Sequence, residues 1–504
     1  MKLAHLLTDF LSLPAQQDRD ISGLSLDSRQ VSYGHLFLAF PGEHVDGRDY
    51  IGAAIQKGAV AVLCEAKGAE LKELKVATTI PLIYIENLQD KLSHLASIFY
   101  AHPSQKMTVI GVTGTNGKTS ICHYLAQILG QLAKPCAVLG TVGNGFLGNL
   151  QTAKLTTPDA IEVQRLLAEY YQQGAEIVVM EVSSHSLIQA RVAAVAFEGA
   201  VFTNLSQDHL DYHGTMHAYG QAKHLLFKFA SLKYVVLNAD DPFSAVIMKS
   251  LSPTVKPYIY SLINQESSST KTATLYAESL HLNDKKLRAN IQTPWGQMLL
   301  ESDILGDFTI SNLLAVLGVL GALEIPLEKL IKPLNQLKAV PGRMDRIGGN
   351  AQWPLIIVDY AHTPDALEKV LSSLRAQCSA QLWCVFGCGG ERDLTKRPLM
   401  AKAAERYADQ IIVTDDNPRH EDPQAIVADI LAGFKDRAKL RVEHDREAAL
   451  AYAIHNAQVE DYILIAGKGH ETYQLIGDCV FEFNDKKIVE KILGEDSACH
   501  QSCN

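Results

Sequence analysis

The chain has 504 residues, of which 47% are hydrophobic and 20% are charged, and a chain of this length is too long for one core and predicts about three domains. Its 46 basic and 56 acidic residues give no basic patch of the kind that binds nucleic acid.

The longest apolar run, 313–323, is too short to cross a bilayer and predicts a buried helix. The pattern of residues 1–13 predicts an amphipathic helix and not a signal peptide. The chain has nine cysteines, mostly in apolar segments, which indicates reduced thiols and no disulfide framework. We therefore expect a cytoplasmic protein that binds neither nucleic acid nor membranes.

Residues 1–88 alternate short apolar, strand-like runs with helix-compatible segments, which predicts a small α/β domain. Two polar clusters follow apolar strands in this region: one is Asp27, Ser28 and Arg29, and the other is the turn at residues 43–48. Loops after strands are common ligand sites in α/β domains, although ordinary solvated turns would have the same composition.

The segment MTVIGVTGTNGKTSICHY, residues 107–124, predicts a strand, a glycine-rich turn and a helix that begins near Lys118. Val112 stands where the strict phosphate-loop pattern requires glycine. Gly114 and Gly117 still allow backbone N–H groups to face phosphate oxygens, Lys118 can reach a terminal phosphate, and Thr119 can hold Mg²⁺. We interpret the segment as a magnesium–nucleotide site; the alternative is a plain turn between strand and helix.

Residues 106–338 repeat a β-branched run, a polar or glycine-rich loop, and a helix, which predicts a parallel sheet covered on both faces. Ligands gather at the carboxyl ends of such strands, where Glu181, Asp208 and His209 fall. Glu181 and His209 are plausible ligands of Mg²⁺ or its waters. Alternatively, the glutamate pairs with a buried neighbour and the histidine caps a turn. Residues 264–303 predict an antiparallel extension of the sheet.

Residues 339–494 predict a third, Rossmann-like α/β domain, in which several strands end in polar or glycine-rich loops. Charged side chains of both signs follow these strands: Arg392, Asp415, Asp416, Arg419, Lys468, His470 and Glu471. Such a set suits a zwitterionic ligand, because each ligand charge needs an opposite partner once water is excluded. A solvated loop face is the alternative. The expected domains are therefore 1–88, 89–338 and 339–494, with a frayed tail at 495–504.

The motifs VTGTNGKTS, EVSSH, VFTNLSQDHLDYHG, GRMD, DYAHTPDAL, FGCGGERD, DDNPR and AGKGHE occur in the order seen in the ATP-dependent Mur ligases, and the chain resembles this family from LDSR to AGKGHE. The resemblance implies a central ATPase domain between a UDP-sugar-binding domain and an amino-acid-binding domain. The members that it resembles add meso-diaminopimelate to UDP-N-acetylmuramoyl-L-alanyl-D-glutamate through an acyl phosphate, in peptidoglycan precursor synthesis. A monomer that uses ATP and Mg²⁺ is expected.

The resemblance also implies roles for individual residues. ATP would contact Gly114, Thr115, Asn116, Gly117, Lys118, Thr119, Ser120, Asn312, Arg343 and His362. The UDP-sugar peptide would contact Leu26, Ser28, His44, Asp46, Gly47, Arg48, Thr156, Thr157, Ser184, Gln189 and Arg191. Diaminopimelate would contact Arg392, Asp416, Asn417, Pro418, Arg419, Gly467 and Glu471. The catalytic residues would be Lys118, Lys223, Glu181 and His209, and Mg²⁺ would be held by Thr119, Glu181, His209 and Lys223 as a carbamate.

Two positions depart from the family pattern, because Leu155 and Thr309 stand where asparagine is usual. Without the family resemblance, the local sequence predicts that Lys223 is an exposed lysine on an amphipathic helix. The runner-up enzymes are a lysine-adding ligase and a folylpolyglutamate synthase, which would share the phosphate-binding turn and differ at DDNPR. A nucleotide-dependent switch that ligates nothing is the alternative from another class.

Overall fold

The computed structural model describes residues 1–42, 45–68, 80–262, 273–283, 286–302 and 306–501. The chain divides into two compact units. The first contains residues 1–111, 134–200 and 225–233, and the second contains residues 112–133, 201–224 and 234–504. Two strands, β5 (Thr108–Thr113) and β10 (Phe197–Phe202), begin in the first unit and end in the second.

The first unit begins with a four-stranded sheet in which all neighbouring strands are parallel. Its strands are, in spatial order, β1 (Gly23–Ser25), β2 (His35–Ala39), β3 (Ala61–Glu65) and β4 (Leu82–Ile85). Side chains alternate between the faces of a strand, so Leu36 and Leu38 join one buried cluster, and Phe37 and Ala39 join another. Helices α1 (Leu3–Leu6) and α3 (Leu88–Phe99) contribute to the first cluster, and α2 (Ile51–Gln56) contributes to the second. This domain therefore has two hydrophobic layers.

The predicted helix over residues 1–13 is wrong in its extent, because α1 covers only Leu3–Leu6. The N-cap residue Lys2 makes no side-chain capping bond, although Oδ1 of Asp18 accepts a hydrogen bond from the N–H of Ala4 over 3.0 Å. Pro14 and a 3₁₀ turn at Ala15–Gln17 follow the helix closely. Burial of Leu3, Leu6 and Leu7 holds this short helix in place.

The rest of the first unit contains strands in the order β5-β9-β6-β7-β8. These are β6 (Cys136–Gly140), β7 (Gly143–Phe146), β8 (Asn149–Gln151) and β9 (Ile177–Glu181), together with β5. β6 is parallel to β9, and β7 and β8 are antiparallel additions. Helix α5 (Ala160–Gln172) begins where the side chain of Asp159 accepts hydrogen bonds from the N–H groups of Ile161 and Glu162. The short helix α6 (Ser184–Ile188) follows β9.

The second unit contains strands in the order β15-β14-β13-β12-β11-β10. They are β11 (Tyr234–Asn238), β12 (Lys256–Ser261), β13 (Leu275–Asn283), β14 (Lys286–Thr293) and β15 (Gly296–Ser302), together with β10. The last three pair antiparallel, which confirms the predicted antiparallel extension over the described residues. The associated helices are α4 (Lys118–Gln131), α7 (Leu210–His213), α8 (Met216–His224), α9 (Phe243–Ser250), α10 (Asp307–Ala322) and α11 (Ile331–Asn335). Residues 313–321 of α10 are buried, as the sequence predicts.

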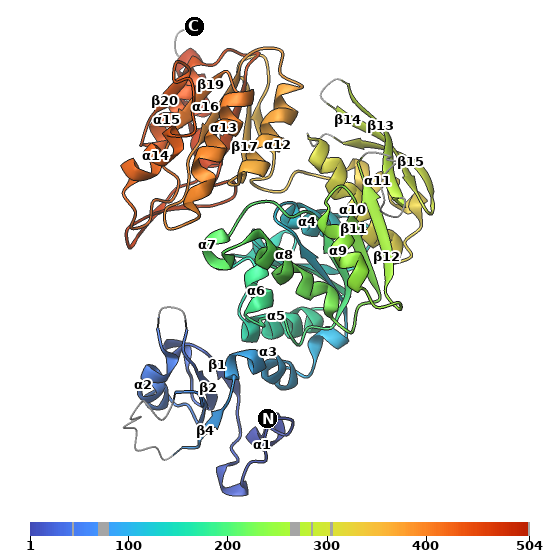
Figure 1. The fold of residues 1–504 in the computed structure, drawn as a ribbon, viewed down its shortest axis with the longest axis vertical. Coiled ribbons are helices and arrows are strands. Elements are labelled where there is room, and N and C mark those ends of the chain that lie inside the picture. Colours follow the sequence, from blue (N-terminus) through green and yellow to red (C-terminus); the bar gives the residue numbers. More distant parts are fainter. Residues whose placement is uncertain (43–44, 69–79, 263–272, 284–285, 303–305, 502–504) are drawn as a thin grey trace. The chain divides into compact units, whose positions relative to one another are not determined.

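The second unit also contains a six-stranded sheet of order β16-β17-β21-β18-β19-β20. Its strands are β16 (Asp345–Gly348), β17 (Leu355–Asp359), β18 (Leu382–Phe386), β19 (Gln410–Val413), β20 (Leu440–Val442) and β21 (Tyr462–Ala466). All neighbouring pairs except β16–β17 are parallel. Helices lie on both faces (Figure 1), as expected for a doubly wound α/β sheet.

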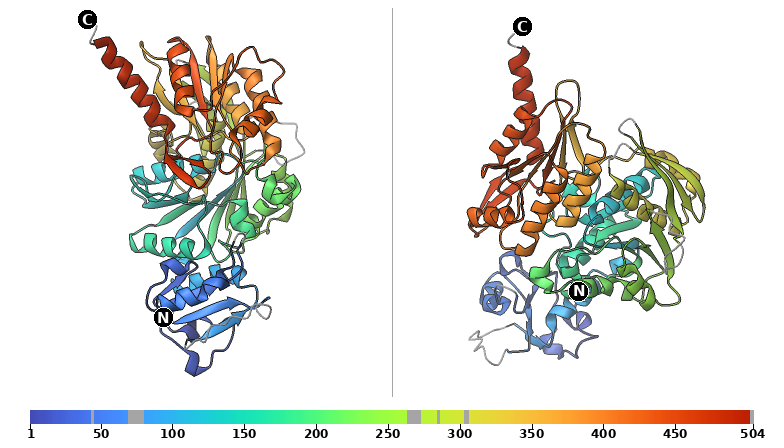
Figure 2. Two further views of the ribbon diagram at one scale, coloured as in Figure 1. Left: turned by 90° about the vertical axis from the view of Figure 1, so that its left-hand side faces the viewer. Right: turned by 45° about the horizontal axis from the view of Figure 1, so that its top comes forward.

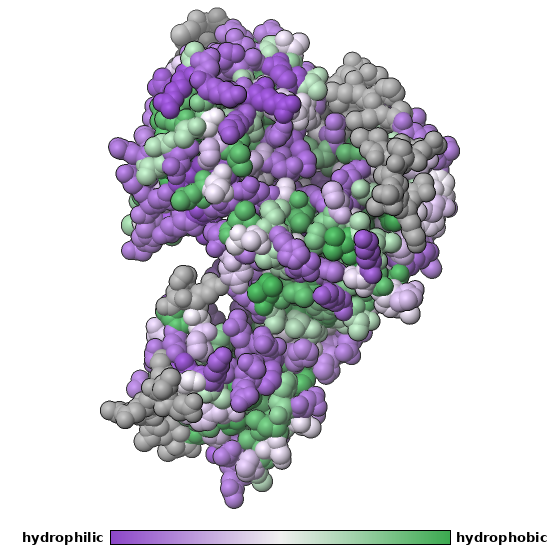
Figure 3. Space-filling view, in the orientation of Figure 1, coloured by the Kyte–Doolittle hydropathy of each residue, from purple (hydrophilic) through white to green (hydrophobic). Residues whose placement is uncertain are grey.

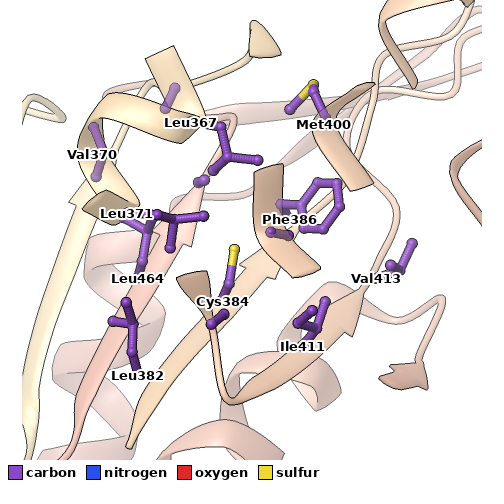
Figure 4. Packing of buried hydrophobic residues seen from close by; sticks show 14 of the residues in the cluster. Leu367, Val370, Leu371, Leu382, Cys384, Phe386, Met400, Ile411, Val413 and Leu464 are labelled. Carbon is purple, nitrogen blue, oxygen red and sulfur yellow. The ribbon is translucent and has the colours of Figure 1, made fainter. Parts of the chain in front are cut away.

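Each face of this sheet has its own hydrophobic core. Helices α12 (Pro364–Arg375), α13 (Arg397–Tyr407) and α14 (Pro423–Leu431) pack on one face, where Leu367 and Leu371 approach Cys384, Phe386 and other strand residues (Figure 4). Helices α15 (Arg446–Asn456) and α16 (Asp485–Gln501) cover the other. The carboxyl ends of the parallel strands are thereby fixed at one edge of a rigid layer.

Two features follow β21. A hairpin formed by β22 (Tyr473–Ile476) and β23 (Cys479–Glu482) comes first, and α16 then extends as one helix toward the C-terminus (Figure 2), beyond the predicted boundary at residue 494. On the face drawn in Figure 3, the surface of residues 345–494 is mainly hydrophilic. Within the described residues, no helix has both the length and the apolar character that a membrane span requires.

His123 provides a test of the packing of α4, because its side chain is buried and Nε2 has no hydrogen-bond partner among the described residues. Burial, with a smaller contribution from the charge of Arg343, lowers the pKa of His123 from 6.5 to about 4. Below pH 6.5 the unfolded chain binds a proton that the folded chain excludes. The free energy of unfolding should therefore fall by up to about 3 kcal/mol as the pH decreases from 6.5 to 4.

Denaturant titrations across this pH range should show a smaller slope for His123→Gln than for the wild type. His94→Gln, which removes an exposed imidazole of α3, is the control. Identical slopes for the wild type and His123→Gln would contradict the prediction.

Candidate active site

The turn at residues 114–117 joins β5 to α4, and α4 begins at Lys118 as the sequence predicts. Gly114 and Gly117 have φ angles of 147° and 88°. A Cβ on Gly114 would collide with the side chain of Thr203, and a Cβ on Gly117 would lie 2.5 Å from Oδ1 of Asn312. Glycine is therefore required at both positions, for backbone conformation and for space. The turn ends at a helix N-terminus, where the helix dipole attracts anions.

A segment that follows β10 holds this turn in place. The N–H of Asn116 donates to Oδ1 of Asn204 over 3.0 Å, and Oγ1 of Thr203 donates to the carbonyl oxygen of Asn116 over 2.6 Å. Nζ of Lys118 donates to the carbonyl oxygens of Gly114 and Thr115 over 2.9 and 2.8 Å. Thr203 and Asn204 lie in the motif VFTNLSQDHLDYHG, but no role was predicted for them. The available signal was two hydrogen-bonding residues directly after a strand.

Lys223 lies beneath the turn, and its Nζ donates to the carbonyl oxygen of Gly114 over 2.9 Å. Only 1% of its surface is exposed, and Nζ is 4.2 Å from the ring centroid of Tyr219 in the same helix. The interpretation of Lys223 as an exposed surface lysine is therefore wrong. Burial, reinforced by the charge of Lys118, lowers the pKa of Lys223 well below its ordinary value. This environment favours the neutral amine over the ammonium.

Two histidine side chains approach the carboxylate of Asp208. Nε2 of His209 is 3.3 Å and Nε2 of His362 is 3.7 Å from Oδ2 of this carboxylate. Burial alone would raise the pKa of Asp208, but the neighbouring imidazole of His362 and the charges of His209 and Lys396 lower it. His209 has a φ angle of 54°, a left-handed conformation at the start of α7. This anionic group helps to position both histidines.

Two of the other residues predicted to contact ATP also lie at the turn. Asn312 of α10 faces Gly117, and the guanidinium of Arg343 donates to Oγ1 of Thr119 over 3.1 Å. The same guanidinium lies 4.2 Å from the ring centroid of Tyr360, which leads to His362. The second unit therefore brings together residues from α4, α8, α10 and the loop after β17.

Several predicted contacts of the UDP-sugar peptide, together with Glu181, form a network in the first unit. Both carboxylate oxygens of Glu181 accept hydrogen bonds from Thr141, one from its N–H over 2.8 Å and one from its hydroxyl over 3.1 Å. The Thr141 hydroxyl also reaches Oγ1 of Thr156, 3.2 Å away. Arg191 donates to the carbonyl oxygen of Thr157 over 2.9 Å and to the side chain of Gln189. Ser184 begins α6.

The two polar clusters of the N-terminal domain form 3₁₀ turns. Asp27 caps the turn Ser28–Gln30 and pairs with Arg29, while Asp46 caps Gly47–Tyr50 and pairs with Arg48. Arg48 is buried and also donates to the carbonyl oxygen of Lys67. His44 lies outside the described residues. The two turns share the same capping geometry.

The carboxyl edge of the six-stranded sheet contains a buried polar network. Nζ of Lys468 donates to Oδ1 of Asn417 and to Oε2 of Glu471, each over 3.0 Å. Asn417 in turn donates from Nδ2 to Oε2 of Glu471 over 2.9 Å. The sequence places Lys468 among the charges at this edge but predicts no role for it. Its side chain is fully buried and orients two of the predicted diaminopimelate contacts.

Arg419 lies beside this network in a left-handed conformation, with a φ angle of 53°. Its backbone N–H donates to the carbonyl oxygen of Leu475 over 3.0 Å, and its guanidinium donates to that of Gly390 over 2.8 Å. Burial, followed by the charge of Arg392, lowers the pKa of Arg419. Asp416 approaches Gly467 so closely that a Cβ there would lie 2.5 Å from Oδ2. Asp415 instead contacts His444.

Within the part of the chain that the structure describes, no group of three or more His, Cys, Asp or Glu side chains is arranged to hold a metal ion. Three of the predicted magnesium ligands, Thr119, His209 and Lys223, belong to the second unit, and Glu181 belongs to the first. A hydroxyl, an imidazole and a carboxylate suit Mg²⁺ or its bound waters, whereas a lysine does so only when it is carbamylated.

Comparisons with known proteins agree with this architecture. Residues 20–100 match the Mur ligase family catalytic domain, residues 112–320 match the Mur ligase middle domain, and residues 342–469 match the Mur ligase glutamate ligase domain. The chain belongs to the Mur ligase family, whose members are ATP-dependent ligases with a three-domain α/β fold.

Close relatives share one name. A UDP-N-acetylmuramoyl-L-alanyl-D-glutamate–2,6-diaminopimelate ligase from Coxiella burnetii is 48% identical over 94% of this chain and 96% of its own length. The ligase of that name from Vibrio vulnificus is 44% identical over 99% of both chains. A solved structure of a ligase with the same name is 38% identical, covers 99% of this chain and 100% of its own, and has a TM-score of 0.68.

The turn at residues 114–117 leads to a prediction for Gly117→Ala. The added methyl group meets Asn312 and requires a left-handed alanine, so ATP affinity should fall at least tenfold, measured by calorimetry. Gly130→Ala, near the end of the same helix, has open space and should retain ATP affinity while gaining up to about 1 kcal/mol in stability. Equal ATP affinity in both variants would contradict this account of the turn.

Proposed function

We propose that the chain joins meso-diaminopimelate to the D-glutamate of UDP-N-acetylmuramoyl-L-alanyl-D-glutamate, with ATP as the energy source. The observation that carries the proposal is the collection of both charge signs at one sheet edge, where the charges of Arg392, Asp416 and Glu471 all act on Arg419. A substrate with two carboxylates and two amino groups complements such a set. The names of the relatives support the same substrates.

The chemistry requires activation of a carboxylate. Transfer of the γ-phosphoryl group of ATP to the D-glutamate carboxylate gives an acyl phosphate and ADP, and attack by the amine then forms the amide and releases phosphate. Lys118 and the N–H groups of the 114–117 turn would neutralise charge on the transferred group. Asn312 and Arg343, which lie at the same turn, and His362, which lies beside Asp208, would hold the nucleotide. The peptide part of the substrate would be bound by Thr156, Thr157, Ser184, Gln189 and Arg191.

Mg²⁺ would neutralise phosphate charge when bound, and Thr119, Glu181, His209 and carbamylated Lys223 would hold it. Carbamylation joins the neutral lysine amine to carbon dioxide and releases a proton. The environment of Lys223 fits this step, because burial disfavours its ammonium form. A carbamate would also supply an oxygen ligand where an amine supplies none.

At the C-terminal site, Arg419 and Arg392 would bind the distal carboxylate of diaminopimelate. Forked guanidinium groups match carboxylate geometry better than an ammonium does. Asp416 or Glu471 would receive the distal ammonium, and Asn417, Pro418 and Gly467 would shape the pocket.

The uridine nucleotide would be bound in the N-terminal domain by Leu26, Ser28, His44, Asp46, Gly47 and Arg48. We further infer a monomeric cytoplasmic enzyme with domains at 1–88, 89–338 and 339–494 and a tail at 495–504.

Phosphate release provides the direct test. It should require ATP, Mg²⁺, the UDP-sugar dipeptide and diaminopimelate together, and lysine should replace diaminopimelate poorly. Lys118→Ala should retain its circular dichroism spectrum but lose turnover. Preference for lysine would overturn the proposed substrate, and near-normal turnover by Lys118→Ala would overturn the proposed nucleotide site.

Lys223→Ala tests the carbamate. The variant should be inactive because it lacks a magnesium ligand, and short carboxylates such as formate should restore part of the activity. Lys228→Ala, which removes a lysine from the next turn of the chain, is the control. Unchanged activity of Lys223→Ala would exclude a role for its carbamate.

Arg419→Ala tests the amino-acid site. Loss of one partner from a desolvated charged pair costs about 2–5 kcal/mol, so kcat/KM for diaminopimelate should fall at least tenfold. Binding of the UDP-sugar dipeptide should remain unchanged. Arg406→Ala, an exposed arginine that pairs with Glu368 on the same sheet domain, should have little effect. Normal use of diaminopimelate by Arg419→Ala would contradict the assignment.

A further inference from the structure

We propose that Arg397 and Glu421 are positioning residues that fix the loops carrying Arg392 and Arg419 for the distal carboxylate of the amino-acid substrate. This inference rests on the proposed function and extends it to two residues that do not line the proposed ligand contacts. The first loop, residues 387–392, follows β18, and the second, residues 414–421, follows β19.

Arg397 is the central member of the pair. Its side chain is fully buried at the beginning of α13, and Glu421 accepts two hydrogen bonds from it, over 2.6 and 2.7 Å. The same guanidinium donates to Asp429 of α14 over 2.9 Å and to the carbonyl oxygen of Gly389 over 3.4 Å. A single side chain therefore connects a helix start, the first loop and the segment directly after Arg419.

Glu421 completes the connection to Arg392. Its Oε2 accepts a hydrogen bond from the backbone N–H of Glu391 over 2.9 Å, and Glu391 immediately precedes Arg392. Glu391 has a left-handed φ angle of 54°. The bond with Arg397 lowers the pKa of Glu421, so this acceptor stays ionised at neutral pH.

Further contacts hold the two loops against each other. The N–H of Gly390 donates to the carbonyl oxygen of Asn417 over 3.0 Å, and the guanidinium of Arg419 donates to that of Gly390. A Cβ on Gly390 would collide with the carbonyl oxygen of Pro418. The loops thus meet through backbone atoms, where even small displacements would move both arginines.

This arrangement needs restraint because it is unfavourable without ligand. Arg392 and Arg419 carry like charges, and Glu391 and Arg419 both have left-handed backbones, which are unfavourable for residues other than glycine. The desolvation penalty of a buried ion pair offsets much of its net stabilisation. The hydrogen bonds and ion pairs of Arg397 and Glu421 therefore act mainly as geometric restraints that preorganise the carboxylate site.

Glu421→Gln and Arg397→Lys test the proposal, because each keeps the approximate size of the side chain and removes the paired forks. Each variant should raise KM for diaminopimelate at least tenfold and leave KM for ATP and for the UDP-sugar dipeptide within twofold. Asp409→Asn is the matched control, since Asp409 pairs with Arg375 at the amino end of β19. It should lower the melting temperature without a change in any KM.

Three results would overturn the inference: unchanged KM for diaminopimelate in both variants, an equal rise for all three substrates, or failure of both variants to fold. If Arg397 and Glu421 had a purely structural role, the variants would either show an equal rise in KM for all three substrates or fail to fold. The wild type separates this inference from the proposed function. If the wild type rejects diaminopimelate, both fail; if it uses diaminopimelate and the variants match it, only the positioning role fails.

Discussion

The hydrogen bond from Nζ of Lys223 to the carbonyl oxygen of Gly114 fixes the turn that we propose as the nucleotide site. It places an amine that has lost its water directly behind a turn suited to phosphate. The helix α8 that supplies this lysine and the turn that receives it cannot separate without leaving a buried donor without its partner. Thr203 and Asn204 hold the other side of the turn, so its shape is established before any ligand arrives.

The amino-acid end of the molecule repeats this design with different residues. Glycines bring backbones into contact, and a buried cation, here Lys468 or Arg397, bonds to groups on neighbouring loops. In both places a buried basic side chain holds a loop, and other groups of that loop are proposed to contact substrate. The strands beneath supply rigidity because both faces of the sheet are packed.

Local patterns predicted much of this architecture. The start of α4 at Lys118, the buried helix α10 and the strands before the polar loops all follow from residues close together in the chain. The burial of Lys223 did not, since its partner is 109 residues away and the periodicity of α8 resembles that of a surface helix. Arg397 was missed for a similar reason, because a lone arginine at a helix start is usually solvated. Contacts between residues far apart in the chain, and not local helix propensity, determine where the side chains of Lys223 and Arg397 lie.

The hairpin β22–β23 allows ligand binding at the proposed amino-acid site to be observed. Arg419 forms a parallel β-bridge with Ile476, and Ile476 pairs across the hairpin with Cys479. Among the cysteines whose side chains the structure describes, six are buried and Cys479 is exposed. A thiol-reactive fluorophore attached to Cys479 would thus sit two backbone pairings from the arginine. Its emission could report ligand arrival in real time, without a coupled assay and without any change to the residues of the site.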